Sequence, residues 1–412
     1  MRAMSLRDDA NYIMKAALTA AMPDAAVCAA LEKVSFGSGK MVLVAVGKAA
    51  WQMTKAAYER LGQRIDHGVV ITKYDHSKGP IGNLAIYEAG HPVPDQNSFR
   101  AADAALEAIE NLTEEDTVLF LLSGGGSALF EKPLIPEADL NRLTKELLSS
   151  GADIGEINTV RKRFSAVKGG RFALACQPAK VITIVLSDVL GDRLDMIASG
   201  PAYPDSTTAE EARRIVRKYD LTMTDEMTEL LGKETPKRLD NAETYITGSV
   251  RQLCVAAETA CRELGYETVI LTDRLSCTAR DAGVFLSNIA GFYAHSGRKM
   301  AFLAGGETVV QVTGQGLGGR NQELALAAAP GISGLNAAVF SLGSDGTDGP
   351  TDAAGGFVDG MTAQNLKGQG ISVSDVLKDN DAYHGLQRCD GLIMTGPTGT
   401  NVNDISVLLI GE

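Results

Sequence analysis

Several glycine-rich segments carry groups that could bind an anion or take part in phosphoryl transfer. The segment SGGGSA (123–128) offers backbone N–H groups that no large side chain covers, together with two hydroxyl groups. Such a segment at a predicted helix start can bind phosphate. It is not a P-loop, because no Gly-Lys-Ser/Thr follows. We predict phosphate contacts from Ser123, Gly124, Gly125, Gly126 and Ser127, and the alternative is a simple packing turn.

Two basic residues lie at predicted helix starts directly after glycine. Lys48 follows Gly47, and its charge there opposes the helix dipole, so a nearby anion would explain it. Arg320 follows the segment TGQGLGG (313–319), and its planar guanidinium group suits a carboxylate or a phosphate. That segment does not indicate dinucleotide binding, because the later acidic residue of such folds is missing. We predict functional roles for both cations.

Other charged residues leave two interpretations open. Asp188 and Asp192 in SDVLGD follow a predicted strand and could hold Mg²⁺, or could form a turn. Lys168 lies in the basic segment RKRFSAVKGGR (161–171), where phosphate binding and helix capping are equally consistent with the pattern. The histidines have no zinc-site spacing, and for His91 in GHPVPD a structural role in a loop is favoured.

The segment GSDGTDGPTDAAGG (343–356) holds three aspartates among turn-forming residues. Their spacing is not that of a calcium loop. We expect Asp345, which is nearest the preceding strand, to contact substrate hydroxyl groups or a hydrated Mg²⁺. We expect Asp348 and Asp352 to bind the backbone of their own loop.

Composition excludes several classes of protein. The 412 residues carry a net charge of −12, without the basic face of a nucleic-acid-binding protein. No apolar run approaches the roughly 20 residues of a membrane span, and the first residues are too polar for a secretory signal. The six cysteines are scattered, as in a cytoplasmic protein with reduced thiols. The partner is therefore expected to be a small molecule.

Short apolar runs alternate with amphipathic segments along the whole chain. Most runs lack polar alternation, which is typical of parallel strands buried on both faces in an α/β fold. The predicted strands are 41–46, 68–72, 117–122, 181–186, 244–247, 268–272, 299–304, 308–313, 337–342, 391–395 and 405–410. The predicted helices are 48–62, 97–112, 137–150, 207–219, 249–265 and 276–297.

The glycine-rich segments follow these strands, and ligands of open α/β sheets bind at the carboxyl ends of the strands. A polar segment (224–243) with mixed charge suggests a domain boundary near residue 238. We therefore predict an N-terminal Rossmann-like domain (1–238), with a parallel sheet flanked by helices, and a smaller C-terminal α/β domain (239–412).

Taken together, the segments resemble the glycerate 2-kinase family over nearly the whole chain. The resemblance is carried by GKAA (47–50), GHPVPD (90–95), SGGGSA (123–128), NTVRKRFSAVKGG (158–170), LSDVLGD (186–192), ASGPAYPD (198–205), GGE (305–307), GQGLGGRNQE (314–323), GSDGTDGPTDAAG (343–355) and GPTGTNVND (396–404). The last two belong to the C-terminal domain called MOFRL, and members are often labelled hydroxypyruvate reductase of tartrate utilisation.

The resemblance implies transfer of the γ-phosphoryl group of ATP to the 2-hydroxyl group of D-glycerate, with Mg²⁺ as cofactor. It implies an active site in the cleft between two domains, with Lys48 and Arg320 as leading catalytic residues. Asp188 would orient Mg²⁺ or accept the hydroxyl proton, and Asp192 would assist with the metal. Substrate contacts are expected from Glu307, Asn321 and Asp345, although metal and substrate ligands are not separated among the carboxylates.

Two other functions compete with this interpretation. A hydroxypyruvate reductase using NAD(P)H would need a strand-GxGxxG-helix unit, which the chain lacks. A non-catalytic sensor of sugar acids or nucleotides would not need paired cations beside carboxylates. Homodimer formation is expected from the family alone, and neither contact with nucleic acid nor contact with a membrane is expected.

Overall fold

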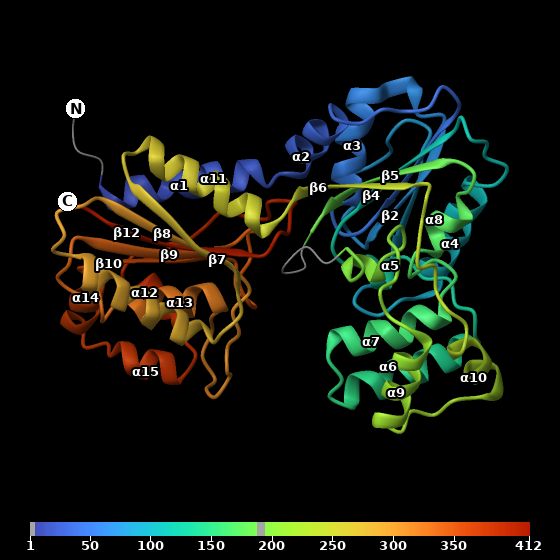
Figure 1. The fold of residues 1–412 in the computed structure, drawn as a ribbon. Coiled ribbons are helices and arrows are strands. Elements are labelled where there is room, and N and C mark those ends of the chain that lie inside the picture. The colour runs from blue at the N-terminus through green and yellow to red at the C-terminus, as the bar shows by residue number, and fades with distance from the viewer. Residues whose placement is uncertain (1–4, 188–193) are drawn as a thin grey trace. The chain divides into compact units, whose positions relative to one another are not determined.

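The computed structural model describes residues 5–187 and 194–412, which form two units. The first unit is Ala26–Thr247, and the second joins the residues up to Ala25 with Gly248–Glu412. Each unit is built on one six-stranded sheet (Figure 1).

The sheet of the first unit has the strand order β3-β2-β1-β4-β5-β6. Its strands are β1 (Met41–Val46), β2 (His67–Lys73), β3 (Ala85–Ala89), β4 (Thr117–Leu122), β5 (Lys180–Leu186) and β6 (Ala242–Gly248). The pairings β2–β3, β1–β2, β1–β4 and β4–β5 are parallel. Every residue of β1 and β4 is buried. This confirms the prediction that apolar runs without polar alternation form a parallel sheet covered on both faces.

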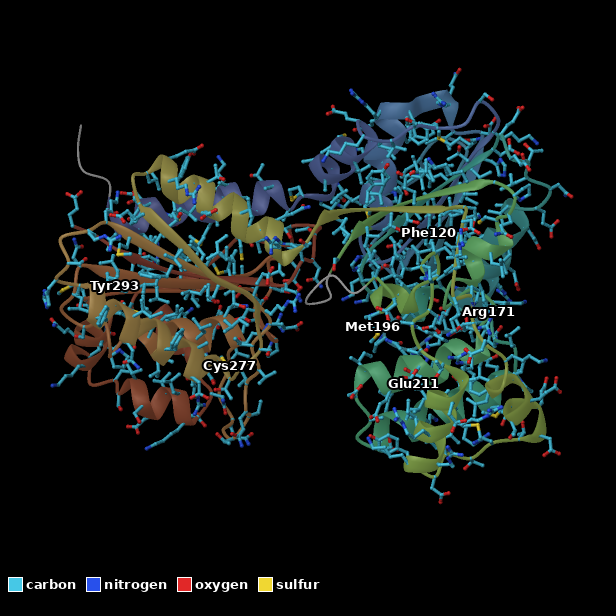
Figure 2. The ribbon with its side chains drawn as sticks, in the orientation of Figure 1. Phe120, Arg171, Met196, Glu211, Cys277 and Tyr293 are labelled. Atoms are coloured by element: carbon cyan, nitrogen blue, oxygen red, sulfur yellow. The ribbon has the colours of Figure 1, made fainter. Side chains whose placement is uncertain are left out.

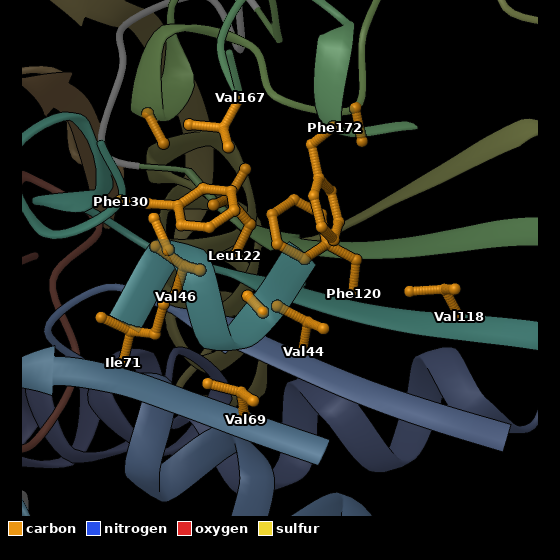
Figure 3. Close-up of a cluster of buried hydrophobic side chains, with 14 of the residues drawn as sticks. Val44, Val46, Val69, Ile71, Val118, Phe120, Leu122, Phe130, Val167 and Phe172 are labelled. Carbon is orange, nitrogen blue, oxygen red and sulfur yellow. The ribbon is translucent and has the colours of Figure 1, made fainter. Parts of the chain in front are cut away.

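Helices cover both faces of this sheet. Alternate residues of each strand enter two separate cores, with Val44 and Phe120 on one face and Leu43 and Leu119 on the other. Figure 3 shows the first core, in which the Phe120 and Phe172 rings lie 4.8 Å apart. The helices of this unit are α2 (Pro23–Leu31), α3 (Ala50–Leu61), α4 (Gln96–Ala108), α5 (Gly126–Leu129), α6 (Glu137–Ser149), α7 (Ile154–Arg161), α8 (Arg171–Ala175), α9 (Ala209–Lys218) and α10 (Asp225–Leu231).

The sheet of the second unit is mixed and has the order β11-β10-β9-β12-β8-β7. Strand β12 is antiparallel to both β8 and β9, whereas β7 is parallel to β8. The strands are β7 (Glu267–Leu275), β8 (Met300–Gly306), β9 (Ala337–Gly343), β10 (Gly355–Asp359), β11 (Leu392–Ile393) and β12 (Asp404–Ile410). The mixed order departs from the mainly parallel arrangement that the apolar runs suggested.

Helices again cover both faces (Figure 1). Helices α1 and α11 share one core with the sheet, and α12 and α13 share the other. The helices of this unit are α1 (Leu6–Ala20), α11 (Val250–Glu263), α12 (Ala279–Tyr293), α13 (Arg320–Ala328), α14 (Thr362–Gly368), α15 (Val373–Lys378) and α16 (Ala382–Gln387).

Two predicted strands differ in the structure. Residues 308–313 form no regular strand and contribute a single bridge between Thr278 and Val309. The run 391–395 shortens to the two residues of β11. Glycine follows or interrupts both segments, so apolar content alone does not sustain a strand there.

The division into units also differs from the predicted boundary. Helix α1 packs on α11, and its buried residues Ile13 and Met14 join the core of the second sheet. The hydroxyl of Tyr266 donates to Asp9 Oδ2 at 2.6 Å, which ties α1 to the start of β7. At the other boundary, β6 completes the first sheet, so the first unit continues past residue 238 to Thr247.

Among the described helices, none is by itself both long and apolar enough to cross a membrane. Helices α1 and α2 together, bent by 50°, reach that length and composition. The apolar face of α1 is buried against the second sheet.

Two glycines of α12 provide a test of the helix packing in the second unit. A Cβ at Gly283 would lie 2.2 Å from the backbone oxygen of Leu324 in α13, whereas a Cβ at Gly291 would meet no atom within 4 Å. We expect Gly283→Ala to lower the free energy of unfolding by about 1–3 kcal/mol, because the two helices must move apart. Gly291→Ala should raise it by about 0.5–1 kcal/mol through helix propensity.

Thermal unfolding of the two variants beside the unchanged protein measures both effects. Equal melting temperatures for the two variants would contradict the close packing of α12 on α13.

Candidate active site

The loops that follow β1 and β4 are joined by close backbone contact. Gly47 has φ 124°, and a Cβ there would lie 2.2 Å from the hydroxyl oxygen of Ser123, so only glycine fits. The Lys48 N–H donates to the carbonyl of Gly124 at 2.9 Å. The Ala49 N–H donates to Ser123 Oγ at 3.1 Å. The two loops therefore form one unit at the carboxyl ends of neighbouring parallel strands.

The glycine loop presents a row of unused donors. Within the described part of the chain, the backbone N–H groups of residues 124–127 donate no hydrogen bond. Gly125 has φ 86°, and a Cβ on it would lie 3.2 Å from Lys48 Cγ, so the lysine side chain runs along the loop. The Lys48 ammonium has no ion pair among the described residues. Consecutive free N–H groups beside an unpaired cation are suited to binding phosphate.

The two serines of this loop have partners inside the protein. Ser123 is buried, and its hydroxyl accepts the Ala49 N–H, which holds the loop in place. Ser127 Oγ lies 2.9 Å from Ser199 Oγ. The backbone of the loop is therefore better placed for an anion than the hydroxyl of Ser123.

Lys168 does not face this loop as a free cation. Its side chain is fully buried, with Nζ 2.8 Å from both Glu131 Oε2 and the carbonyl of Phe130. Burial lowers the pKa of Lys168 to about 8. An ammonium in this position stabilises the buried Glu131 carboxylate. The geometry corrects the prediction that Lys168 binds phosphate, because the pair is closed to solvent.

The neighbouring basic residues are also engaged in structural contacts. Lys162 is buried and pairs with Asp205 at 3.0 Å. Arg171, labelled in Figure 2, donates to the carbonyl of Ser165 at 2.8 Å. The basic segment 161–171 is thus a buried framework of the first unit and not an anion-binding surface.

In the second unit, Arg320 lies between two carboxylates. Its Nε donates to Asp404 Oδ2 at 2.5 Å and its Nη2 to Asp404 Oδ1 at 3.0 Å. Its Nη1 lies 2.9 Å from Glu307 Oε1. Asp404 begins β12 and pairs in the sheet with Gly306 and Gly343, the last residues of β8 and β9. The ends of β8 and β9 and the start of β12 therefore position this group.

The two carboxylates around Arg320 differ in burial. The Asp404 side chain is 7% exposed and that of Glu307 is 46% exposed. Burial raises the pKa of Asp404 to about 6, although Arg320 opposes this shift. Burial alone would lower the pKa of Arg320, but Asp404 and Glu307 raise it, so the guanidinium stays charged. Asp404 holds the Nε and Nη2 edge of the guanidinium in a fixed orientation, while the more exposed Glu307 contacts Nη1.

Asp348 caps α13 and so fixes the start of the helix that carries Arg320. Its Oδ1 accepts the Asn321 N–H at 3.1 Å and its Oδ2 accepts the Gln322 N–H at 2.9 Å. A Cβ at Gly319 would lie 2.2 Å from the Asp348 carboxyl carbon, which explains the glycine there. The prediction that Asp348 binds its own loop is wrong, because the carboxylate reaches a helix start 27 residues earlier in the chain.

Asn321 is buried and not open to a substrate. Its Nδ2 donates to Asp348 Oδ1 at 3.2 Å, and its Oδ1 accepts the Ser341 hydroxyl at 2.5 Å. The side chain thus links α13 to the capping aspartate and to β9. This geometry corrects the prediction that Asn321 contacts substrate.

Of the other two aspartates in the segment 343–356, Asp345 contacts its own loop and Asp352 contacts Tyr383, so the prediction that Asp352 binds the backbone of its own loop is wrong. Asp345 Oδ1 accepts the Thr347 N–H at 3.0 Å, so it stabilises its own loop while remaining partly exposed. Asp352 Oδ1 accepts the Tyr383 hydroxyl at 2.8 Å, outside its own loop. A direct role of Asp345 toward substrate or metal stays a prediction.

Asp188 and Asp192 lie outside the described residues, so their metal and catalytic roles stay predictions. The sequence patterns do not single out Asp404, although it lies in the segment GPTGTNVND that carries part of the family resemblance. The feature of the sequence that could identify Asp404 is its place between a glycine-rich segment and a predicted strand of apolar residues.

Two family models match the chain. The model described as a domain of unknown function, DUF4147, matches residues 9–232. The model described as the MOFRL family matches residues 300–404.

Proteins of known name are similar over nearly the full length. A D-glycerate 2-kinase of Thermotoga maritima is 51% identical, covering 98% of this chain and 99% of the relative. A glycerate 2-kinase of Pyrococcus horikoshii is 40% identical, covering 100% and 98%. A protein of Agrobacterium vitis with the provisional name hydroxypyruvate reductase is 38% identical, covering 90% and 100%.

Solved structures agree with these relatives. The crystal structure of a glycerate kinase of T. maritima matches with a TM-score of 0.96 at 51% identity, covering 98% of this chain and 99% of that chain. A protein of P. horikoshii matches with a TM-score of 0.92 at 40% identity, covering 100% of both chains. The chain therefore belongs to the glycerate 2-kinase family, and in it a DUF4147 region precedes a MOFRL region.

Proposed function

We propose that this protein is an ATP-dependent glycerate 2-kinase, which phosphorylates the 2-hydroxyl group of D-glycerate and releases ADP and 2-phosphoglycerate. The observation that carries the proposal is the Lys48 ammonium, which has no ion pair within residues 5–187 and 194–412, beside the N–H groups of residues 124–127, which donate to none of these residues. Membership of the family and the names of its relatives supply the substrate and the phosphate donor.

The residues around Lys48 fit the phosphates of a nucleotide. ATP supplies the phosphoryl group when bound, and catalysis of such a transfer is mostly positioning and charge neutralisation. The N–H groups of residues 124–127 would hold phosphate oxygens, and Lys48 would balance their charge. The serine contacts and Gly47 keep these donors in place before any ligand arrives.

The arrangement around Arg320 fits a small carboxylic acid. Asp404 holds the Nε and Nη2 edge of the guanidinium, which leaves the Nη1 edge for a substrate carboxylate. We assign Glu307, which now meets Nη1 and also accepts from Asn403 Nδ2 at 3.2 Å, to the hydroxyl groups of glycerate. An exposed carboxylate can change partners at small cost when substrate arrives.

Mg²⁺ is part of the proposal and rests on the chemistry of the donors. Among the described residues, no group of three or more His, Cys, Asp or Glu side chains could hold a metal ion. We propose a metal bound mainly by nucleotide phosphates with one or two carboxylates, as Mg²⁺ commonly is. Asp188 and Asp192 remain the proposed ligands, with Asp345 as the other candidate for metal or substrate.

We also propose a cytoplasmic location and a homodimeric state. The six cysteines form no disulfide in the structure, which supports a reducing compartment. The homodimer rests on the family expectation, and size-exclusion chromatography with light scattering would decide it.

Removing either cation should abolish most of the activity. We expect Lys48→Ala and Arg320→Ala each to lower kcat/KM by about 10²-fold or more, since each removes one preorganised charge. ADP release with D-glycerate and ATP measures this effect. Lys55→Ala and Arg388→Ala serve as matched controls, because both side chains are exposed elsewhere in the same two units.

The same assay separates the rival functions. Hydroxypyruvate-dependent oxidation of NADH without ADP release would overturn the assignment as a kinase and support a hydroxypyruvate reductase. If the protein binds these ligands but turns over neither D-glycerate with ATP nor hydroxypyruvate with NADH, the result would favour a non-catalytic sensor.

The pH dependence of stability should report the buried Asp404. Because its native pKa of about 6 is above the ordinary value of 3.8, the native state holds this proton more tightly than the unfolded chain. The stability that Asp404 contributes is therefore present below pH ~4 and is lost as pH rises through ~6. Asp404→Asn lacks this dependence, so the melting temperature of the variant relative to the unchanged protein should rise over that window. A constant difference would contradict the raised pKa.

A further inference from the structure

His91 lies against the same glycine loop as Lys48. A Cβ on Gly125 would lie 3.1 Å from His91 Cδ2, 3.2 Å from His91 Nε2 and 3.2 Å from Lys48 Cγ. The imidazole ring and the lysine side chain therefore both border Gly125, at the centre of the row of free N–H groups. His91 reaches this position from the segment between β3 and α4, which follows the carboxyl end of β3.

The ring nitrogens of His91 differ from those of His67 and His76 in their contacts with the described residues. Within residues 5–187 and 194–412, neither nitrogen of His91 has a hydrogen-bond partner. By contrast, His76 Nδ1 lies 3.1 Å from the Lys48 carbonyl, and His67 Nε2 lies 3.0 Å from the Ala108 carbonyl. A partly buried imidazole whose nitrogens have no partner among these residues is not explained by the loop-structural role that the sequence favours.

The surroundings of His91 keep its ring neutral. Burial lowers its pKa to about 4, and the charges of Lys48, Lys73 and His76 act in the same direction. A neutral imidazole has one nitrogen with a lone pair and can accept a proton at physiological pH. The nearby Lys48 charge opposes protonation at rest, but a bound phosphate would offset that charge.

We propose that His91 is a catalytic residue that accepts the proton of the substrate hydroxyl during phosphoryl transfer. This inference rests on the proposed function. The hydroxyl oxygen forms a bond to the γ-phosphorus, the bond from that phosphorus to the bridging oxygen of ADP breaks, and ADP leaves with the electron pair. The hydroxyl proton passes to the free imidazole nitrogen and then to solvent, so charge and atoms balance. A weakly basic acceptor suffices, because kinases commonly use an aspartate for this task.

The test uses two substitutions of His91 and one matched control in the full-length protein. His91→Gln keeps a hydrogen-bonding side chain but removes the titrating group, and His91→Ala opens space for added imidazole. His67→Gln is the control, because His67 lies at the start of β2, whereas His91 follows the carboxyl end of the neighbouring parallel strand β3. The measurements are kcat, KM for D-glycerate, nucleotide affinity and melting temperature.

We expect kcat to fall about 10²-fold or more in both His91 variants, in line with loss of a general base. Nucleotide affinity and melting temperature should stay close to those of the unchanged protein, and imidazole should restore part of the kcat of His91→Ala. The control should retain full activity.

Two results would overturn the assignment. One is a kcat within about threefold of normal in both variants, far short of loss of a general base. The other is a loss of kcat that imidazole does not restore and that accompanies a lowered melting temperature. If Asp188→Asn loses kcat while His91→Gln does not, His91 is not the proton acceptor. If the unchanged protein releases no ADP with D-glycerate, the proposed function fails instead, independently of His91.

Discussion

The close approach of Gly47 to Ser123 is the constraint on which the phosphate-binding geometry depends. Parallel strands β1 and β4 bring their carboxyl ends side by side, but a side chain at Gly47 would force the loops apart. With the loops in contact, the Lys48 N–H donates a backbone hydrogen bond to the glycine loop. The donors are thus held in place by the fold, and a ligand need not order them on arrival.

In the second unit, the main electrostatic feature is the fixed orientation of Arg320. Asp404 provides this orientation from a buried position at the junction of β8, β9 and β12. A buried carboxylate costs free energy, but a paired guanidinium with two fixed donors offsets much of that cost. The capping of α13 by Asp348 adds a second restraint on the same residue, because Arg320 is the first residue of that helix.

Part of this arrangement can be predicted from local sequence patterns. The burial of individual polar side chains cannot be predicted in this way. The glycine loop and Lys48 are recognisable because strand, glycine and helix follow one another in the chain, and Arg320 because glycines directly precede a helix start. Lys168 and Asn321 looked equally polar in sequence, yet tertiary packing closes both from solvent. The same limit applies to α1, whose partner α11 begins about 230 residues later, and to Asp404, whose importance depends on where β12 lies in the sheet. An amphipathic pattern indicates that a face is covered, but not by which element.

The discontinuity of the second unit has a consequence for synthesis of the chain. Helix α1 is synthesised before the first unit, but the α11 and β7 residues that bury it are added only after that whole unit. During that interval, Ile13 and Met14 have no native partner, and the first unit can fold as a continuous segment. The newly made chain therefore carries an exposed apolar helix ahead of the first unit, which is a natural target for a chaperone until the second sheet is complete.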